Sequence, residues 1–143
     1  MSYWDTSALV KLYLVEPDSA QFESLALASP VVIGMTARHE MRTVFRRREA
    51  EAVIPAGEAT ALYQRMTSDA ASGVLRLQSD SDDVEREFGT VLEKCFSQTP
   101  PLFIRTNDGL HLAAARVAGE TEFVTADLRQ RAAAQLLGFT LLP

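Results

Sequence analysis

Short apolar segments alternate with longer amphipathic segments along the whole chain. Between the apolar segments, hydrophobic residues recur at the spacing of one face of a helix. The apolar segments are short and rich in β-branched or aromatic residues, which is typical of buried strands; they lie at 2–5, 30–35, 74–78, 122–127 and 139–142. Regular alternation of this kind predicts an α/β fold, with a parallel sheet of about five short strands and helices on both faces.

Several residues mark where the predicted helices begin and end. Thr36 is an expected N-cap of a helix that runs to about Glu51, and Pro55 is expected to open the next one. Gly119 and Gly138 are expected to end the last two helices, because glycine readily adopts the left-handed conformation that follows a helix. No repeat or linker interrupts the pattern, so we expect one domain over residues 1–143.

Composition describes an ordinary globular protein with 47% hydrophobic and 23% charged residues. No apolar run is long enough to span a bilayer, and the N-terminal segment lacks the pattern of a secretory signal. Cys95 is the single cysteine and cannot form an internal disulfide, which fits a reducing compartment. We therefore expect a cytoplasmic protein without a membrane partner.

The net charge of −5 argues against a protein that coats nucleic acid nonspecifically, since such proteins are usually strongly basic. A local patch remains available, because five arginines fall in one predicted helix: Arg38, Arg42, Arg46, Arg47 and Arg48. Two interpretations stay open. The arginines contact phosphate, or they form a solvated helix face balanced by Glu49 and Glu51.

Four acidic residues follow the predicted strands at positions that chemistry can use. Asp5 and Asp127 end the first and fourth strands, while Glu40 and Asp108 lie near the starts of two helices. Ligands of open parallel sheets bind at the carboxyl ends of the strands. We therefore expect these carboxylates to meet at one edge of the sheet. Any one of them alone is more often a helix cap or a surface group, and only their joint placement indicates a site.

Clustered carboxylates repel one another, so we expect a bound cation and at least one carboxyl pKa raised by this repulsion. Oxygen ligands suit Mg²⁺ or Mn²⁺, and no set of Cys and His residues has zinc spacing. Such ions activate water and stabilise charge on phosphate oxygens, which favours metal-assisted phosphodiester hydrolysis. His39 and His111 both lie beside acids, but metal-bound water needs no histidine base. Each is interpreted as covering the sheet or facing solvent.

Four stretches resemble the signature blocks of the PIN-domain family, and of its VapC-type toxins in particular. They are DTSALVKLYLVEPDS, HEMRTVFRRRE, TNDGLHLAAARVAG and FVTADLRQRAAAQLLGF, in the order that the family has. The resemblance implies that Asp5, Glu40, Asp108 and Asp127 are the catalytic and metal-binding acids. One departure is Gly109, where the family often has alanine, a change that costs about 1 kcal/mol of helix stability.

The resemblance further implies a Mg²⁺- or Mn²⁺-dependent endoribonuclease with a parallel α/β fold. Its toxin members cut RNA, are held inactive by a cognate antitoxin and commonly form homodimers. For this chain, the apolar residues of the first two helices suggest a groove that an antitoxin segment covers; they are Leu9, Leu12, Tyr13, Phe22 and Leu25. Two alternatives stay open: a PIN-fold RNA-processing nuclease without an antitoxin, and a non-catalytic interaction domain. Retention of all four acids argues against the second.

Overall fold

The computed structural model describes residues 1–143 and contains one five-stranded parallel sheet. Along the sheet the order is β3-β2-β1-β4-β5, so the first strand lies at the centre. The strands are β1 (Ser2–Trp4), β2 (Val31–Gly34), β3 (Leu75–Gln78), β4 (Glu122–Val124) and β5 (Thr140–Leu142). Every neighbouring pair is parallel, which confirms the predicted fold class.

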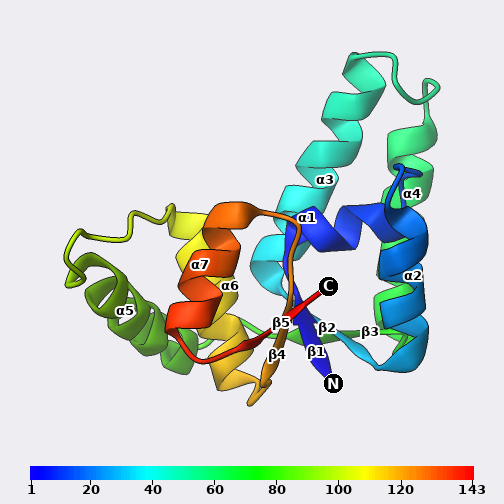
Figure 1. Ribbon diagram of the computed structural model, residues 1–143. Coiled ribbons are helices and arrows are strands. Elements are labelled where there is room, and N and C mark those ends of the chain that lie inside the picture. The colour runs from blue at the N-terminus through cyan, green and yellow to red at the C-terminus, as the bar shows by residue number, and fades with distance from the viewer.

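Helices cover both faces of the sheet, as Figure 1 shows. One group comprises α1 (Thr6–Leu9), the 3₁₀ turn η1 (Val10–Leu12), α2 (Ser19–Ala28), α3 (Met35–Ala50) and α4 (Glu58–Ser72). The other comprises α5 (Asp82–Phe96), α6 (Thr106–Val117) and α7 (Leu128–Leu136). No helix combines the length and the apolar character that crossing a membrane would require.

Two hydrophobic cores form because successive side chains of a strand point to opposite faces. Trp4 packs with Phe22 of α2 and Phe45 of α3 in the first core. Tyr3, its neighbour in β1, packs with Phe123 and with the alanine-rich side of α6 in the second. A three-residue strand therefore supplies a large aromatic residue to each core.

Several predicted boundaries differ from the structure. Thr36 is not a cap, because α3 begins at Met35 and its N-cap, Gly34, has no side chain to bond the free amides. The helix expected at Pro55 begins at Glu58, after Gly57 turns the chain with a φ of 87°. The fourth strand ends at Val124, three residues earlier than predicted.

The expected groove over the first two helices is wrong for two of its residues. Leu9 is fully buried and Phe22 is 2% exposed, both within the first hydrophobic core. Hydrophobic residues at helical spacing predict a buried helix face. They do not indicate whether that face packs against the protein's own sheet or against a partner. These two side chains are used by the fold itself.

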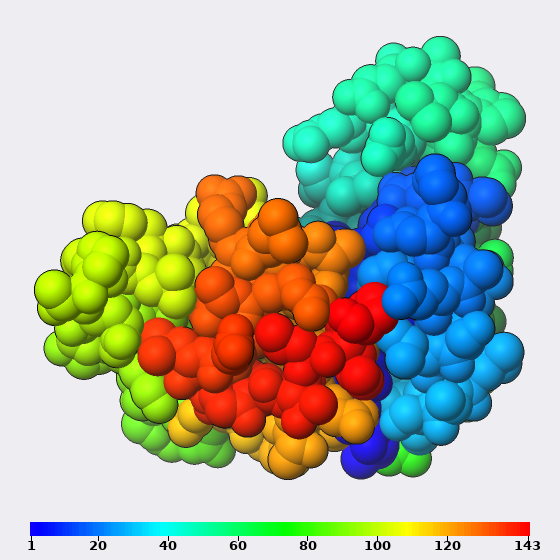
Figure 2. Space-filling model, viewed as in Figure 1, coloured from blue at the N-terminus to red at the C-terminus, as the bar shows by residue number.

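The molecule is hollowed on the side toward which the strands run. The space-filling view shows α3 and α4 projecting upward, with a depression between them and the start of α7 (Figure 2). In the same orientation the carboxyl ends of β1 and β4 point toward that depression (Figure 1).

Candidate active site

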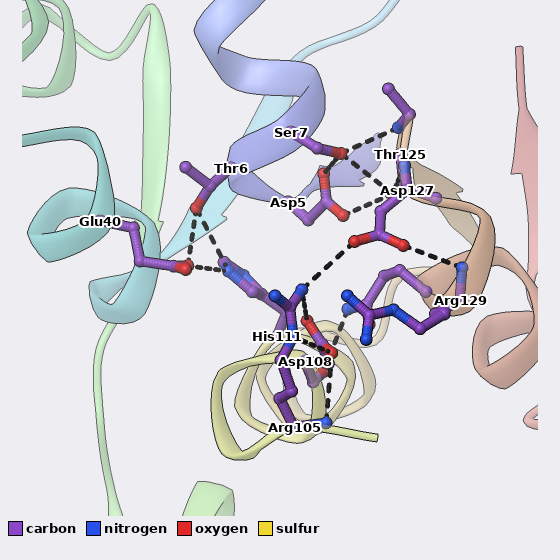
Figure 3. A network of polar contacts seen from close by, with 12 residues as sticks. Asp5, Thr6, Ser7, Glu40, Arg105, Asp108, His111, Thr125, Asp127 and Arg129 are labelled. Carbon is purple, nitrogen blue, oxygen red and sulfur yellow. Dashed lines mark hydrogen bonds and ion pairs between the residues drawn. The ribbon is translucent and has the colours of Figure 1, made fainter. Parts of the chain in front are cut away.

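The four predicted acids come from four elements, three of which directly follow strands of the sheet. Asp5 follows β1 and caps α1, and Glu40 lies in α3 after β2. Asp108 is in the first turn of α6, and Asp127 caps α7 shortly after β4. Their side chains gather at the carboxyl edge of the sheet, as Figure 3 shows. The structure brings them to one region but gives them three separate sets of partners.

Asp5 is the most enclosed of the four, at 4% exposed. Its Oδ1 accepts hydrogen bonds from Ser7 Oγ at 2.7 Å and from the Ala8 amide at 3.1 Å. Its Oδ2 accepts one from Thr125 Oγ1. These donors come from α1 and from the chain just after β4, so they hold the carboxylate in one rotamer.

The pKa of the Asp5 carboxyl is raised, as the sequence predicts, but the cause is different. Burial is the largest influence, whereas nearby His111 and the hydrogen bonds from Thr125, Ser7 and Ala8 act to lower the pKa. Repulsion by the other acids was the predicted cause. It is not the dominant one, because hydroxyls and cationic groups separate the carboxylates.

Arg105 joins the next two acids. Its Nε donates to Asp108 Oδ2 at 3.0 Å, and its Nη2 donates to Asp108 Oδ1 and to Asp127 Oδ2, both at 3.2 Å. The hydrogen bond with Asp108 is the main reason that the pKa of Arg105 is raised. A guanidinium therefore lies where two carboxylates converge, and its own side chain remains 60% exposed.

Glu40 has a partner that the sequence interpretation missed. His111 is 3% exposed, and its Nε2 lies 2.6 Å from Glu40 Oε1. Thr6 Oγ1 donates to the same oxygen at 2.8 Å. A usable signal was present, because His111 follows Asp108 by three residues and so lies on the same face of α6. His111 is buried, as a residue that covers the sheet would be, but its contact with Glu40 was not predicted.

Two arginines of α3, Arg42 and Arg46, have partners other than the acids. Arg42 stacks over the Tyr63 ring of α4, with 4.8 Å between the guanidinium carbon and the ring centroid. Arg46 pairs with Glu49 at 2.8 Å, and both arginines line a hollow of about 410 Å³ between α3 and α4. The Arg46–Glu49 pair agrees with the solvated-face interpretation, and neither arginine contacts the acids.

Gly109, the departure from the family pattern, has a packing reason. A β-carbon at this position would lie 2.7 Å from Cε2 and 3.1 Å from Cδ2 of the Phe88 ring. The missing side chain lets α5 approach α6 closely next to Asp108. The change therefore leaves the acid in place and serves the packing of the two helices.

The carboxylate oxygens of the four acids are suitable ligands for a hard divalent ion, although the side chains are not arranged around one. As they lie, no three histidine, cysteine or acidic residues are close enough together to hold one ion. Arg105 instead supplies positive charge between Asp108 and Asp127. Since this guanidinium is exposed, it can move aside without disturbing the core. Four carboxylates that need a cation are compatible with Mg²⁺ or Mn²⁺.

Comparisons with known proteins identify the fold. No family model and no curated protein sequence matches the chain. Among solved structures, VapC20 of Mycobacterium tuberculosis, a sarcin–ricin loop cleaving toxin, has a TM-score of 0.72 and 18% identity, over 98% of this chain and 97% of that one. A chain of FitAcB from Neisseria gonorrhoeae has a TM-score of 0.69 and 14% identity, over 100% and 97%.

A third structure belongs to the same group. A chain of VapBC2 from Rickettsia felis, bound to a DNA fragment from its promoter, has a TM-score of 0.68 and 17% identity, over 99% of this chain and 98% of that one. Each match extends over almost the full length of both chains, so the strand order and the helical layers are shared. The chain has the fold of the VapC toxins, the PIN-type α/β domain that the sequence resemblance predicts.

Proposed function

We propose that this chain is a divalent-metal-dependent endoribonuclease and the toxin of a toxin–antitoxin pair. One observation carries the proposal: Asp5, Glu40, Asp108 and Asp127 gather at the carboxyl edge of a sheet with the VapC fold. Ligands of parallel sheets bind at this edge, and carboxylates clustered there are suited to bind divalent cations.

The four acids would hold the ion or ions. When bound, Mg²⁺ or Mn²⁺ supplies an activated water and neutralises charge on the phosphate undergoing hydrolysis. Asp5 is kept in one rotamer by Ser7, Ala8 and Thr125, so its oxygens need no reorganisation when the substrate arrives. Arg105 is exposed beside Asp108 and is suited to contact a phosphate of the RNA backbone.

The partner and compartment follow from the same proposal. FitAcB and VapBC2 are assemblies, and we propose that this chain likewise binds a cognate antitoxin and forms a homodimer in the cytoplasm. An antitoxin that inhibits by direct contact would place a basic side chain among the acids, because an arginine matches the geometry of a carboxylate.

RNA cleavage by the purified protein tests the enzyme. We expect cleavage with Mg²⁺ or Mn²⁺ and none with a chelator. Asp108→Asn keeps the shape of the side chain but removes its charge, and should lower the rate roughly 100-fold or more. Asp83→Asn is the matched control, since Asp83 is an exposed residue in the first turn of α5 and pairs only with Arg86.

Two results would contradict the nuclease proposal. One is cleavage that continues at full rate in chelator, and the other is an Asp108→Asn protein that cleaves RNA as fast as Asp83→Asn. Mapping the cleaved ends of cellular RNA after controlled expression would then identify the substrate.

Growth of the host tests the toxin role separately. Induction should slow growth, and co-expression with a short open reading frame adjacent to the gene should restore it. Unchanged growth with a folded, cleaving protein would favour the RNA-processing nuclease. Unchanged growth with no metal binding by calorimetry would favour the interaction domain.

A further inference from the structure

A histidine that the proposed chemistry does not use lies buried between a tyrosine and one of the acids. His111 Nδ1 is 3.0 Å from Tyr3 Oη, and its Nε2 is 2.6 Å from Glu40 Oε1. Tyr3 is fully buried in the central strand, and its ring meets the imidazole edge-on, with 6.0 Å between the two ring centroids. Three elements, β1, α6 and α3, thus form one hydrogen-bonded row that ends on Glu40.

The surroundings of Tyr3 determine which way its hydroxyl points. Burial raises the pKa of the Tyr3 phenol above its ordinary value, and nearby Asp5 raises it further, while a hydrogen bond from the Gly34 backbone acts in the opposite direction. The phenol therefore keeps its proton. Its O–H is then available to donate to His111 Nδ1, 3.0 Å away.

This donation fixes the tautomer of His111. A ring nitrogen that accepts a hydrogen bond carries no proton, so the proton of the neutral imidazole lies on Nε2. Nε2–H then donates to Glu40 Oε1. The opposite tautomer would place two lone pairs against each other at 2.6 Å and would leave the Tyr3 hydroxyl facing an N–H group.

Glu40 receives two hydrogen bonds on the same oxygen. His111 Nε2 and Thr6 Oγ1 both reach Oε1, and neither uses Oε2. One oxygen of the carboxylate is therefore occupied by the protein.

We propose that Tyr3 and His111 are positioning residues that hold the Glu40 carboxylate in a single orientation and reserve Oε2 for a divalent ion. The proposal rests on the proposed function, because Glu40 is taken as a ligand there. Neither residue touches the ion or the substrate. Their role is to remove the rotational freedom of one ligand before binding, as carboxylates and carbonyls do for metal-bound histidines.

Two substitutions of His111 separate the two ring nitrogens. In His111→Gln the amide nitrogen can occupy the place of Nε2 and still donate to Glu40, whereas the shorter side chain of His111→Asn reaches only the place of Nδ1. Tyr3→Phe removes the hydroxyl that fixes the tautomer. Tyr13→Phe is the matched control, because Tyr13 Oη is also largely buried but bonds Asp69, away from the acids.

Calorimetric titration of the folded proteins with Mn²⁺ alone is the first measurement. Loss of an outer hydrogen-bond partner of a metal ligand typically weakens metal affinity by roughly 10- to 100-fold. We expect that loss in His111→Asn and Tyr3→Phe, with His111→Gln and Tyr13→Phe close to the wild type. Affinities of all four variants within twofold of the wild type would overturn the proposal, as would equal losses in His111→Gln and His111→Asn when both melt as cooperatively as the wild type.

Nitrogen NMR of the metal-free wild type is the second measurement, and it does not depend on activity. The two-bond correlation pattern of the His111 ring should show a protonated Nε2 and an unprotonated Nδ1, and Tyr3→Phe should disturb this pattern. A proton on Nδ1 in the wild type would overturn the proposal. A wild type that binds no Mn²⁺ yet shows a protonated Nε2 would refute the proposed function and, with it, the reservation of Oε2 for an ion.

Discussion

Replacing Gly34 by alanine tests whether the fold keeps space for the Tyr3 hydroxyl. Gly34 ends β2 with an ordinary φ of −93°, so alanine meets no backbone obstacle there. Its β-carbon, however, would lie 2.6 Å from Tyr3 Oη and 3.3 Å from Ala114 Cβ. Tyr3 is fully buried between Phe123 and His111, so its ring has little room to withdraw.

The expected magnitude comes from two opposing effects. Overpacking of a well-packed core typically costs about 1–3 kcal/mol. Alanine also restricts the unfolded chain, which stabilises the protein by about 0.4–1 kcal/mol. We therefore expect Gly34→Ala to lower the free energy of unfolding by about 1–2 kcal/mol.

The same structure predicts a strong coupling with Tyr3→Phe. That change alone leaves His111 Nδ1 without its buried donor, at a cost of about 1–3 kcal/mol. It also removes the oxygen that the new β-carbon would meet, so that Ala114 Cβ at 3.3 Å and the ring Cζ of residue 3 at 3.6 Å become the nearest atoms. In the Tyr3→Phe background, Gly34→Ala should therefore cost nothing or stabilise by up to about 1 kcal/mol.

Urea unfolding of the wild type, both single variants and the double variant measures this cycle. Gly89→Ala is the control for the substitution itself, since nothing lies within 4 Å of its added carbon and α5 should gain up to about 1 kcal/mol. Sites that do not interact give free energies that add within about 0.5 kcal/mol. Additivity at Gly34 and Tyr3 within that margin would refute the argument that the glycine makes room for the hydroxyl.

Two further predictions concern the acids. Burial raises the pKa of Asp5 in the folded protein above its value in the unfolded chain. Between these two pKa values the folded protein binds more protons than the unfolded chain. The stability that this group contributes is therefore lost as the pH rises through the pKa of the folded state. Asp5→Asn should therefore stabilise the metal-free protein at pH 7, and thermal melts should show this gain shrinking toward acid pH; a gain that grows in acid would contradict the assigned direction. Arg105→Gln leaves Asp108 and Asp127 without their shared cation. It should lower the melting temperature in chelator and enlarge the rise produced by Mg²⁺, whereas equal rises in variant and wild type would show that the ion does not compete with the guanidinium.

The sequence predicted the parallel sheet and its five strands, since these depend on patterns local to each segment. The four acids do lie at the carboxyl edge of that sheet, but not around a single ion. Helix starts were less predictable. A threonine at position 36 looks like a cap, but tertiary packing begins α3 at Met35 with Gly34 before it. The residues near a helix start favour certain boundaries, but the exact first residue of the helix depends on where the chain leaves the sheet.

The polar partners of the acids could not be predicted from the spacing of residues in the sequence. Whether Arg105 turns toward Asp108 or solvent depends on the rotamers of a long side chain. The pairing of His111 with Glu40 joins residues 71 positions apart and requires α3 and α6 to be placed first. The raised pKa of Asp5 was predicted for the wrong reason, because burial is a property of the assembled cores.

The central position of β1 also determines when the site can come into being during synthesis. β1 is made before the other four strands and pairs with β4, the fourth in chain order, and the Asp5–Thr125 bond spans 120 positions of the chain. A ribosome extends the chain from its N-terminus, so a nascent chain of this protein has Asp5 long before it has Thr125 or Asp127. The four acids can come together only after Asp127 has been made. Vectorial synthesis thus keeps a nascent chain that ends before this residue from assembling the set.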